Sequence, residues 1–139
     1  MIKKIFSTAV NSNNIDYILL LLRVCVGIFM LTHGVGKFDK LFSGAEIQFP
    51  DPLGVGASAS LALAVFSEVF CSIFLIIGFA TRLSALPLII TMFVAVFIIH
   101  WGDDFGRKEL PLIYLAVYLV LAIMGGGRFS IDNWIYKKL

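Results

Sequence analysis

The sequence predicts an all-α integral membrane protein, a bundle of four transmembrane helices. The chain has 139 residues, 60% of them hydrophobic, and its mean hydropathy is +0.97. A soluble domain is nearer half apolar, so this excess favours a membrane protein. The apolar residues also gather in four long segments, at about 16–35, 57–80, 83–101 and 110–125. The connections are short, so residues 1–139 are expected to form a single membrane domain.

The first segment contains the run Leu19 to Leu22 and is long enough to cross a membrane. An apolar helix needs roughly 20 residues to span a hydrocarbon core of about 30 Å. Lys3 and Lys4 precede the segment, as basic residues do in a secretory signal peptide. The apolar run is longer than the roughly 7–15 residues of a signal core, and no Ala-x-Ala cleavage site follows it. We therefore expect a permanent span.

The second and third segments also meet this length, whereas the fourth is short and its ends are less well defined. In lipid every backbone N–H and C=O group needs an internal partner, so all four segments are predicted as helices. The longest connection, residues 38–56, follows the first span. Its first part forms either a short amphipathic helix in the membrane interface or a simple connector. Pro50 and Pro52 indicate a turn in its second part.

The distribution of charge predicts the orientation of the bundle. Four spans place both termini on one side, which carries six basic residues: Lys3, Lys4, Arg82, Arg128, Lys137 and Lys138. The opposite side carries four, Lys37, Lys40, Arg107 and Lys108, diluted by acidic residues. Basic loops favour the cytoplasm, so both termini are predicted to be cytoplasmic and the 38–56 loop to lie outside.

Two charged side chains lie inside the first two segments, Arg23 and Glu68. A charge at the bilayer centre costs between about 2.5 and more than 10 kcal/mol, so such residues are expected to be paired. At helical rise, Arg23 lies about 9 Å and Glu68 about 18 Å from the cytoplasmic side. We predict an Arg23–Glu68 ion pair. The alternative is that Arg23 extends toward Asp16 on its own face, in which case Glu68 is expected to be protonated.

Small residues accompany both charges and predict that the first two helices pack closely. One face of the first span carries Arg23, Gly27, Met30, His33, Gly34 and Lys37. The matching face of the second carries Ala57, Ala64, Glu68, Cys71 and Ser72. Small residues let helices approach each other in lipid, where the hydrophobic effect cannot drive association. Cys25 and Cys71 are expected to act as small apolar residues.

A second group of polar residues is predicted at the outer mouth of the bundle. It comprises two histidines, a lysine and several carboxylates: His33, Lys37, His100, Asp103, Asp104 and Glu109. The hydroxyls of Tyr114 and Tyr118 on the fourth span are expected to join it. Such a group can relay protons, bind a metal or hydrogen-bond a quinone carbonyl. The alternative is a solvated belt of helix ends. No Cys/His spacing typical of a structural zinc site occurs in the sequence.

These landmarks, in this order, resemble the DoxX family. The resemblance rests on Leu22-Arg23-Val24, His33-Gly34-x-x-Lys37, Glu68, Thr81-Arg82-Leu83, His100, Glu109 and the run from Gly127 to Asp132. It covers residues 17–133 and implies a four-span inner-membrane protein of bacteria or archaea. Some members of that family are subunits of a thiosulfate:quinone oxidoreductase, and others associate with membrane redox complexes. The resemblance thus implies fold and location, and redox partnership only by association.

Three functions follow from these patterns. The first is a membrane subunit or partner of a redox system that binds a quinone or another small lipophilic molecule between its helices. There, Arg23 and Glu68 would set the polarity of the site, and His33, His100 and Glu109 would handle protons. The second is a non-catalytic scaffold whose ion pair sets helix register. The third, a proton-coupled small-solute transporter, needs paired broken helices, and Pro87 offers only one break.

The expected partners are the lipid bilayer, a lipophilic ligand and subunits of a redox complex, and an oligomer remains open. Basic patches with interleaved aromatic residues are absent from the sequence, so no nucleic acid is expected. Whether the chain is itself an enzyme stays open.

Overall fold

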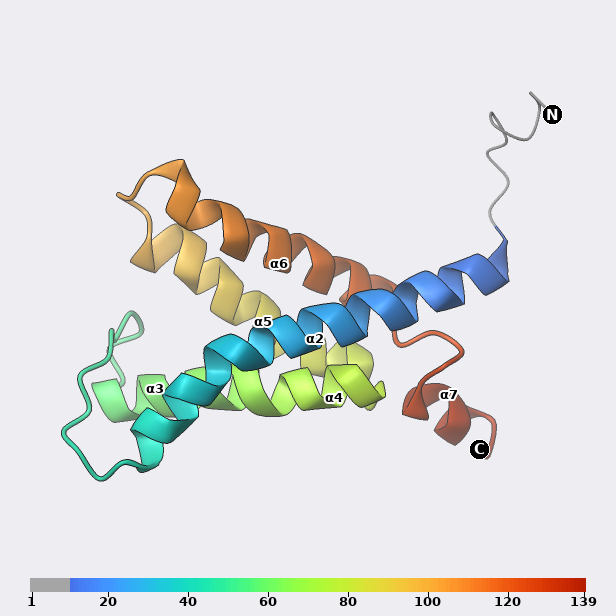
Figure 1. The fold of residues 1–139 in the computed structure, drawn as a ribbon, viewed down its shortest axis with the longest axis horizontal. Helices are drawn as coiled ribbons and strands as arrows, with labels where there is room; N and C mark the ends of the chain where they lie inside the picture. Colours follow the sequence, from blue (N-terminus) through green and yellow to red (C-terminus); the bar gives the residue numbers. More distant parts are fainter. Residues whose placement is uncertain (1–10) are drawn as a thin grey trace.

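A computed structural model describes residues 11–139 (Figure 1), and all regular secondary structure in this range is helical. The all-α prediction is therefore confirmed for these residues. Lys3 and Lys4, which entered the topology prediction, lie outside them. The elements are α2 (Ser12–Phe42), α3 (Ala57–Val65), η1 (Phe66–Cys71), α4 (Ser72–Ile77), α5 (Thr81–Val94), η2 (Ala95–Ile99), α6 (Phe105–Met124) and α7 (Ile131–Tyr136).

Three helical stretches in the described part of the chain are long and apolar enough to cross a membrane. They are α2, the continuous stretch α3–η1–α4 and the continuous stretch α5–η2. The fourth predicted span corresponds to α6, which has 20 residues. Its first turns carry Arg107, Lys108 and Glu109, so its composition is less apolar than that of the other three.

α2 is longer than the predicted first span, since it begins at Ser12 and ends at Phe42. Its N-terminus is capped by the Asn11 side chain, which accepts a hydrogen bond from the Asn13 N–H at 3.0 Å. Residues 38–42 continue this helix, so they do not form a separate interfacial one. At 1.5 Å per residue, 31 residues extend about 46 Å, which exceeds the hydrocarbon thickness.

α2 packs along the whole α3–η1–α4 stretch, while α5 packs against α6 and η1 (Figure 1). Glycines make the first contact close. A Cβ on Gly27 would lie 2.6 Å from Ile76 Cγ1, and one on Gly34 would lie 3.0 Å from the Glu68 carbonyl carbon. The close approach predicted from the small residues is therefore present, and it places Gly34 directly against Glu68.

The segment after α6, residues 125–132, folds back over one end of the bundle; we call it the C-terminal clamp. The Asp132 carboxylate accepts two backbone N–H groups at the start of α5, at 2.6 and 2.8 Å. The Arg128 N–H donates to Asp16 Oδ1 at 2.8 Å. The clamp therefore ties α2 to the turn between α4 and α5, elements far away in the sequence.

Candidate functional site

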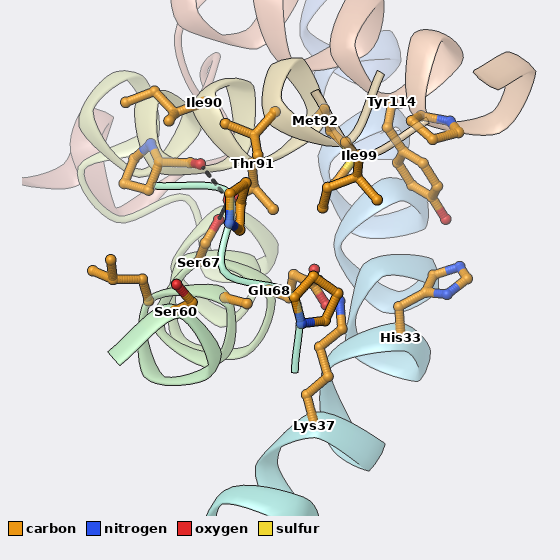
Figure 2. Close-up of a pocket in the computed structure, with 18 of the residues that line it drawn as sticks. His33, Lys37, Ser60, Ser67, Glu68, Ile90, Thr91, Met92, Ile99 and Tyr114 are labelled. Atoms are coloured by element: carbon orange, nitrogen blue, oxygen red, sulfur yellow. Dashed lines mark hydrogen bonds and ion pairs between the residues drawn. The ribbon is translucent and has the colours of Figure 1, made fainter. Parts of the chain in front are cut away.

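A cavity of about 670 Å³ lies at the other end of the bundle, among α2, α3, η1, α5, η2, α6 and the 43–56 loop. Most of its wall is apolar. The polar side chains in the wall are His33, Lys37, Ser60, Ser67, Glu68, Thr91, His100 and Tyr114. Figure 2 shows Lys37 and Glu68 together at one side of this space, with His33 and Tyr114 beside them.

The charged centre of the cavity wall is an ion pair between Lys37 and Glu68. Lys37 Nζ lies 2.5 Å from Glu68 Oε1, and Glu68 is only 3% exposed. The second carboxylate oxygen, Oε2, is buried and has no hydrogen-bond partner among the described residues. The ring of Phe49, from the 43–56 loop, lies 6.0 Å from Lys37 Nζ. One carboxylate oxygen thus stays available to a further donor.

The backbone of η1 explains how Glu68 comes to face inward. η1 is a π-helical turn, which is wider than an α-helical turn and recurs at functional sites. In it, two consecutive residues, Ser67 and Glu68, are both buried. Ser67 Oγ lies 2.9 Å from Thr91 Oγ1, which also donates to the Pro87 carbonyl at 2.8 Å. The wide turn thus supplies two adjacent polar groups to one wall.

Aromatic residues extend the polar wall into the bundle. The His33 ring stands at right angles to Tyr114, with ring centroids 6.1 Å apart. Tyr114 stacks on Tyr118 at 6.0 Å. Tyr118 is fully buried one turn deeper, and its hydroxyl has no hydrogen-bond partner in residues 11–139. Tyr114 therefore lines the cavity, whereas Tyr118 lies behind it.

His100 forms the rim of the cavity where η2 ends. Its Nδ1 lies 2.7 Å from Asp103 Oδ2, and Arg107 Nη1 lies 3.4 Å from the same oxygen. The hydrogen bond with His100, with Arg107 nearby, holds the pKa of Asp103 below its ordinary value. Asp103 thus orients the imidazole so that its other ring nitrogen is free for a ligand.

The 43–56 loop covers one side of the cavity and is anchored by Asp51. The Asp51 carboxylate accepts hydrogen bonds from Ser60 Oγ and the Gly56 N–H, both at 2.7 Å, and from the Val55 N–H at 3.0 Å. The bond from Ser60, followed by those from the backbone, lowers the pKa of Asp51. Lys40 Nζ also donates to the Gln48 carbonyl. These bonds hold the loop against α2 and α3.

The predicted Arg23–Glu68 ion pair is wrong. Arg23 is 2% exposed and donates from Nη2 to the Phe129 carbonyl in the C-terminal clamp. The alternative contact with Asp16 is also not formed, since Asp16 accepts from the Arg128 N–H. Depth explains both results. Glu68 packs against Gly34, and Arg23 lies eleven residues, or about 16 Å, further along α2.

The structure therefore gathers five of the eight predicted site residues around the cavity: His33, Lys37, Glu68, His100 and Tyr114. Arg23, Glu109 and Tyr118 lie elsewhere. Glu109 is exposed on the first turns of α6, where the next two residues face the cavity instead. Sequence reasoning missed Ser67 and Thr91, and it predicted a turn at Pro50 and Pro52 without placing either residue in the wall of a cavity. In the part of the chain described, His, Cys, Asp and Glu side chains form no group of three able to hold a metal.

Comparison with known proteins places the chain among membrane proteins. The sequence model of the DoxX family matches residues 18–101. A Haemophilus influenzae protein described as uncharacterized is 37% identical over 126 residues, which cover 86% of this chain and 83% of that protein. Bacillus subtilis "Putative oxidoreductase CatD" is 27% identical, over 85% and 87%. Escherichia coli inner membrane protein YqjF is 29% identical, over 88% and 95%. No solved structure matches significantly.

Proposed function

This chain belongs to the DoxX family of membrane proteins, and on that premise we propose that it binds a quinone or another small lipophilic molecule in the cavity beside Glu68. In this role it is a membrane subunit or partner of a redox system. The observation that carries the proposal is the cavity itself: a mostly apolar space with a few convergent polar groups. Its volume of about 670 Å³ lies within the usual range for small-molecule sites, about 300–1,000 Å³.

The polar groups of the wall suit both redox states of a quinone. A quinone carbonyl accepts hydrogen bonds, which Lys37 Nζ, the Tyr114 hydroxyl and the imidazole of His33 can donate. A hydroquinone hydroxyl donates, and Glu68 Oε2 is a buried acceptor without a partner in residues 11–139. The same wall therefore holds the ring before and after two electrons and two protons are added.

The approach route also favours a lipophilic molecule. Leu63 and Ile90 line the cavity and are 52% and 60% exposed on the sides of two apolar helices. In a bilayer these side chains face acyl chains, so a molecule dissolved in lipid reaches the cavity without crossing water. The name of the Bacillus subtilis relative, an oxidoreductase, supports a redox ligand over a structural lipid.

We further propose that α6 is the fourth span, that both termini are cytoplasmic and that the protein resides in the bacterial inner membrane. α6 is about 30 Å long at helical rise. Exposed Trp101 and Trp134 lie toward opposite ends of the bundle, as interfacial anchors do. A cysteine at Ala45 should react with a membrane-impermeant maleimide outside intact cells. Reaction only after the cells are opened would contradict this orientation.

The ligand proposal is tested by titrating ubiquinone-1 into the purified protein and into two carboxylate variants. Glu68→Gln removes the negative charge that pairs with Lys37 and replaces one acceptor oxygen by an N–H₂ donor. We expect affinity to fall roughly tenfold or more, as for a charged hydrogen bond of about 1.5–3 kcal/mol. Glu46→Gln is the control, because Glu46 is exposed in the loop and does not line the cavity. Equal affinity of Glu68→Gln and wild type, or no binding at all, would remove the proposal.

The scaffold function rests on the same ion pair, because it joins α2 to η1 one turn from the close contact of Gly34 with Glu68. The double variant Lys37→Met with Glu68→Leu separates the two functions. If the pair sets only helix register, an apolar replacement preserves both folding and cellular function. If the pair serves a ligand, the variant folds and function is lost.

A further inference from the structure

A second cavity, of about 450 Å³, lies at the clamp end of the bundle, among the start of α5, the end of α6 and α7. We propose that this cavity binds the phosphate headgroup of an anionic phospholipid. The proposal concerns the opposite end of the molecule from the Glu68 cavity, and it stands whether or not the ligand proposal holds.

The first observation is a buried hydroxyl on a residue of the cavity wall. Thr81 is 0% exposed and lines the cavity, and its Oγ1 has no hydrogen-bond partner among residues 11–139. Leaving a buried polar atom unpaired costs about 1–3 kcal/mol, and native proteins seldom do so. A Cβ on Gly126 would lie 2.7 Å from this oxygen, so the absence of a side chain at that position keeps room around the hydroxyl.

The second observation is a guanidinium at the rim of the same cavity. Arg82 lines it and makes no hydrogen bond or ion pair with any described residue. Arg107, by contrast, pairs with Asp103. Arg82 lies over the glycine run of the clamp, because a Cβ on Gly125 would be 3.2 Å from Arg82 Nε. A guanidinium without other partners can donate two parallel hydrogen bonds to the oxygens of one phosphate group.

The charge of this cavity favours an anion although Asp132 is part of its wall. Both oxygens of the Asp132 carboxylate already accept backbone N–H groups of α5. The same carboxylate interacts electrostatically with buried Arg23. The Asp132 charge is thus engaged by backbone N–H groups and by Arg23 behind the wall, and Arg82 is the charged side chain of the wall that is left to meet an anion.

The surroundings of the cavity favour a lipid over a free phosphate ion. Two wall residues, Leu83 and Met124, are 68% and 46% exposed on apolar helices, where acyl chains run alongside them. α7 carries exposed Trp134 and Tyr136 and is followed by two lysines, a composition typical of the headgroup region. A headgroup in the cavity would thus meet Arg82 and Thr81 while its chains remain in the bilayer.

The experiment is native mass spectrometry of the delipidated full chain with phosphatidylglycerol or with phosphatidylcholine of the same acyl chains. We expect retention of phosphatidylglycerol to exceed that of phosphatidylcholine. Arg82→Gln should lower the phosphatidylglycerol affinity about tenfold, and Thr81→Val should lower it several-fold. Because Thr81 Oγ1 has no hydrogen-bond partner in the described part of the chain, Thr81→Val should keep the thermal stability of the wild type. Arg107→Gln is the matched control and should behave as wild type.

Equal retention of the two lipids, or unchanged binding in Arg82→Gln, would overturn the proposal. Inorganic phosphate is the second probe. If inorganic phosphate binds at this cavity and displaces phosphatidylglycerol, and the acyl chains add nothing to the affinity, the site binds a free anion. The lipid assignment is then wrong. Ubiquinone-1 binding is also measured on Arg82→Gln and Thr81→Val and should not change. A failure of the lipid proposal is therefore distinguishable from a failure of the ligand proposal.

Discussion

Lys37 Nζ and Glu68 Oε1, 2.5 Å apart, join α2 to the π-helical turn η1 at the wall of the larger cavity. The carboxylate is buried, while the lysine side chain is about one-third exposed. The pair is therefore asymmetric: water can solvate the cation when its partner is removed, but it cannot solvate the anion. This difference decides what each single substitution does.

Lys37→Met should destabilise the protein, because it leaves the Glu68 carboxylate buried without a counterion. We expect the free energy of unfolding in detergent to fall by about 1–3 kcal/mol, the cost of an unpaired buried polar group. Adding Glu68→Leu should recover most of this loss. Lys137→Met, at an exposed position after α7, is the control. A double variant as unstable as the single one would show that the loss comes from packing and not from charge.

The glycines of α2 offer a test of the close helix contact. Gly34→Ala should lower the thermal midpoint, because its Cβ would lie 2.8 Å from Val69 Cγ2 and 3.0 Å from the Glu68 carbonyl carbon. Gly36→Ala meets nothing within 4 Å and should raise the midpoint slightly, since alanine favours a helix by about 1 kcal/mol over glycine. Thermal unfolding followed by circular dichroism measures both. Similar effects of the two substitutions would argue against this packing.

The anchor of the 43–56 loop should depend on pH through Asp51. Its pKa is lowered in the folded loop, so the carboxylate stabilises the loop above the ordinary pKa of aspartate, and this stability is lost as pH falls through the lowered value. Hydrogen exchange at Val55 and Gly56 should therefore be protected at neutral pH and lose protection in acid. Asp51→Asn should give low protection at every pH. Asp39→Asn, an exposed position on α2, should match wild type.

The C-terminal clamp should depend on the charge of Asp132. In Asp132→Asn the amide group retains one acceptor oxygen and turns an N–H₂ donor toward the other backbone N–H of α5. We expect the free energy of unfolding to fall by about 1–3 kcal/mol and the chain to be cleaved sooner by protease after α6. Unchanged proteolysis would mean that the other clamp contacts, such as Arg128 to Asp16, hold the segment without it.

Hydropathy and periodicity predicted the all-helical fold and the burial of Glu68, because both properties depend on the residue and its near neighbours. They could not identify the partner of Glu68. Arg23 and Lys37 are fourteen residues apart, close to four helical turns, so they share one face of α2 and periodicity does not distinguish them. Whether Arg23 or Lys37 pairs with Glu68 depends on the axial position of one helix relative to the other. The contact of Gly34 with Glu68 fixes that position.

The partner of Arg23 and the loop residues of the cavity wall could not be predicted from the sequence for a different reason. The acceptor of Arg23 is the backbone carbonyl of Phe129, 106 residues away, and every residue carries such a carbonyl. No residue type marks that partner. The loop residues around Phe49 and Pro50 joined the cavity wall only because Asp51 folds the loop back onto Ser60.

The bond between Arg23 and Phe129 has a consequence for biosynthesis. The arginine enters the membrane with α2, whereas its acceptor is translated 106 residues later. Until Phe129 has been translated, the guanidinium must form its hydrogen bonds with water or lipid phosphate, so α2 reaches its final depth only after that point. A message cut short before codon 129 would yield a chain in which α2 never reaches that depth.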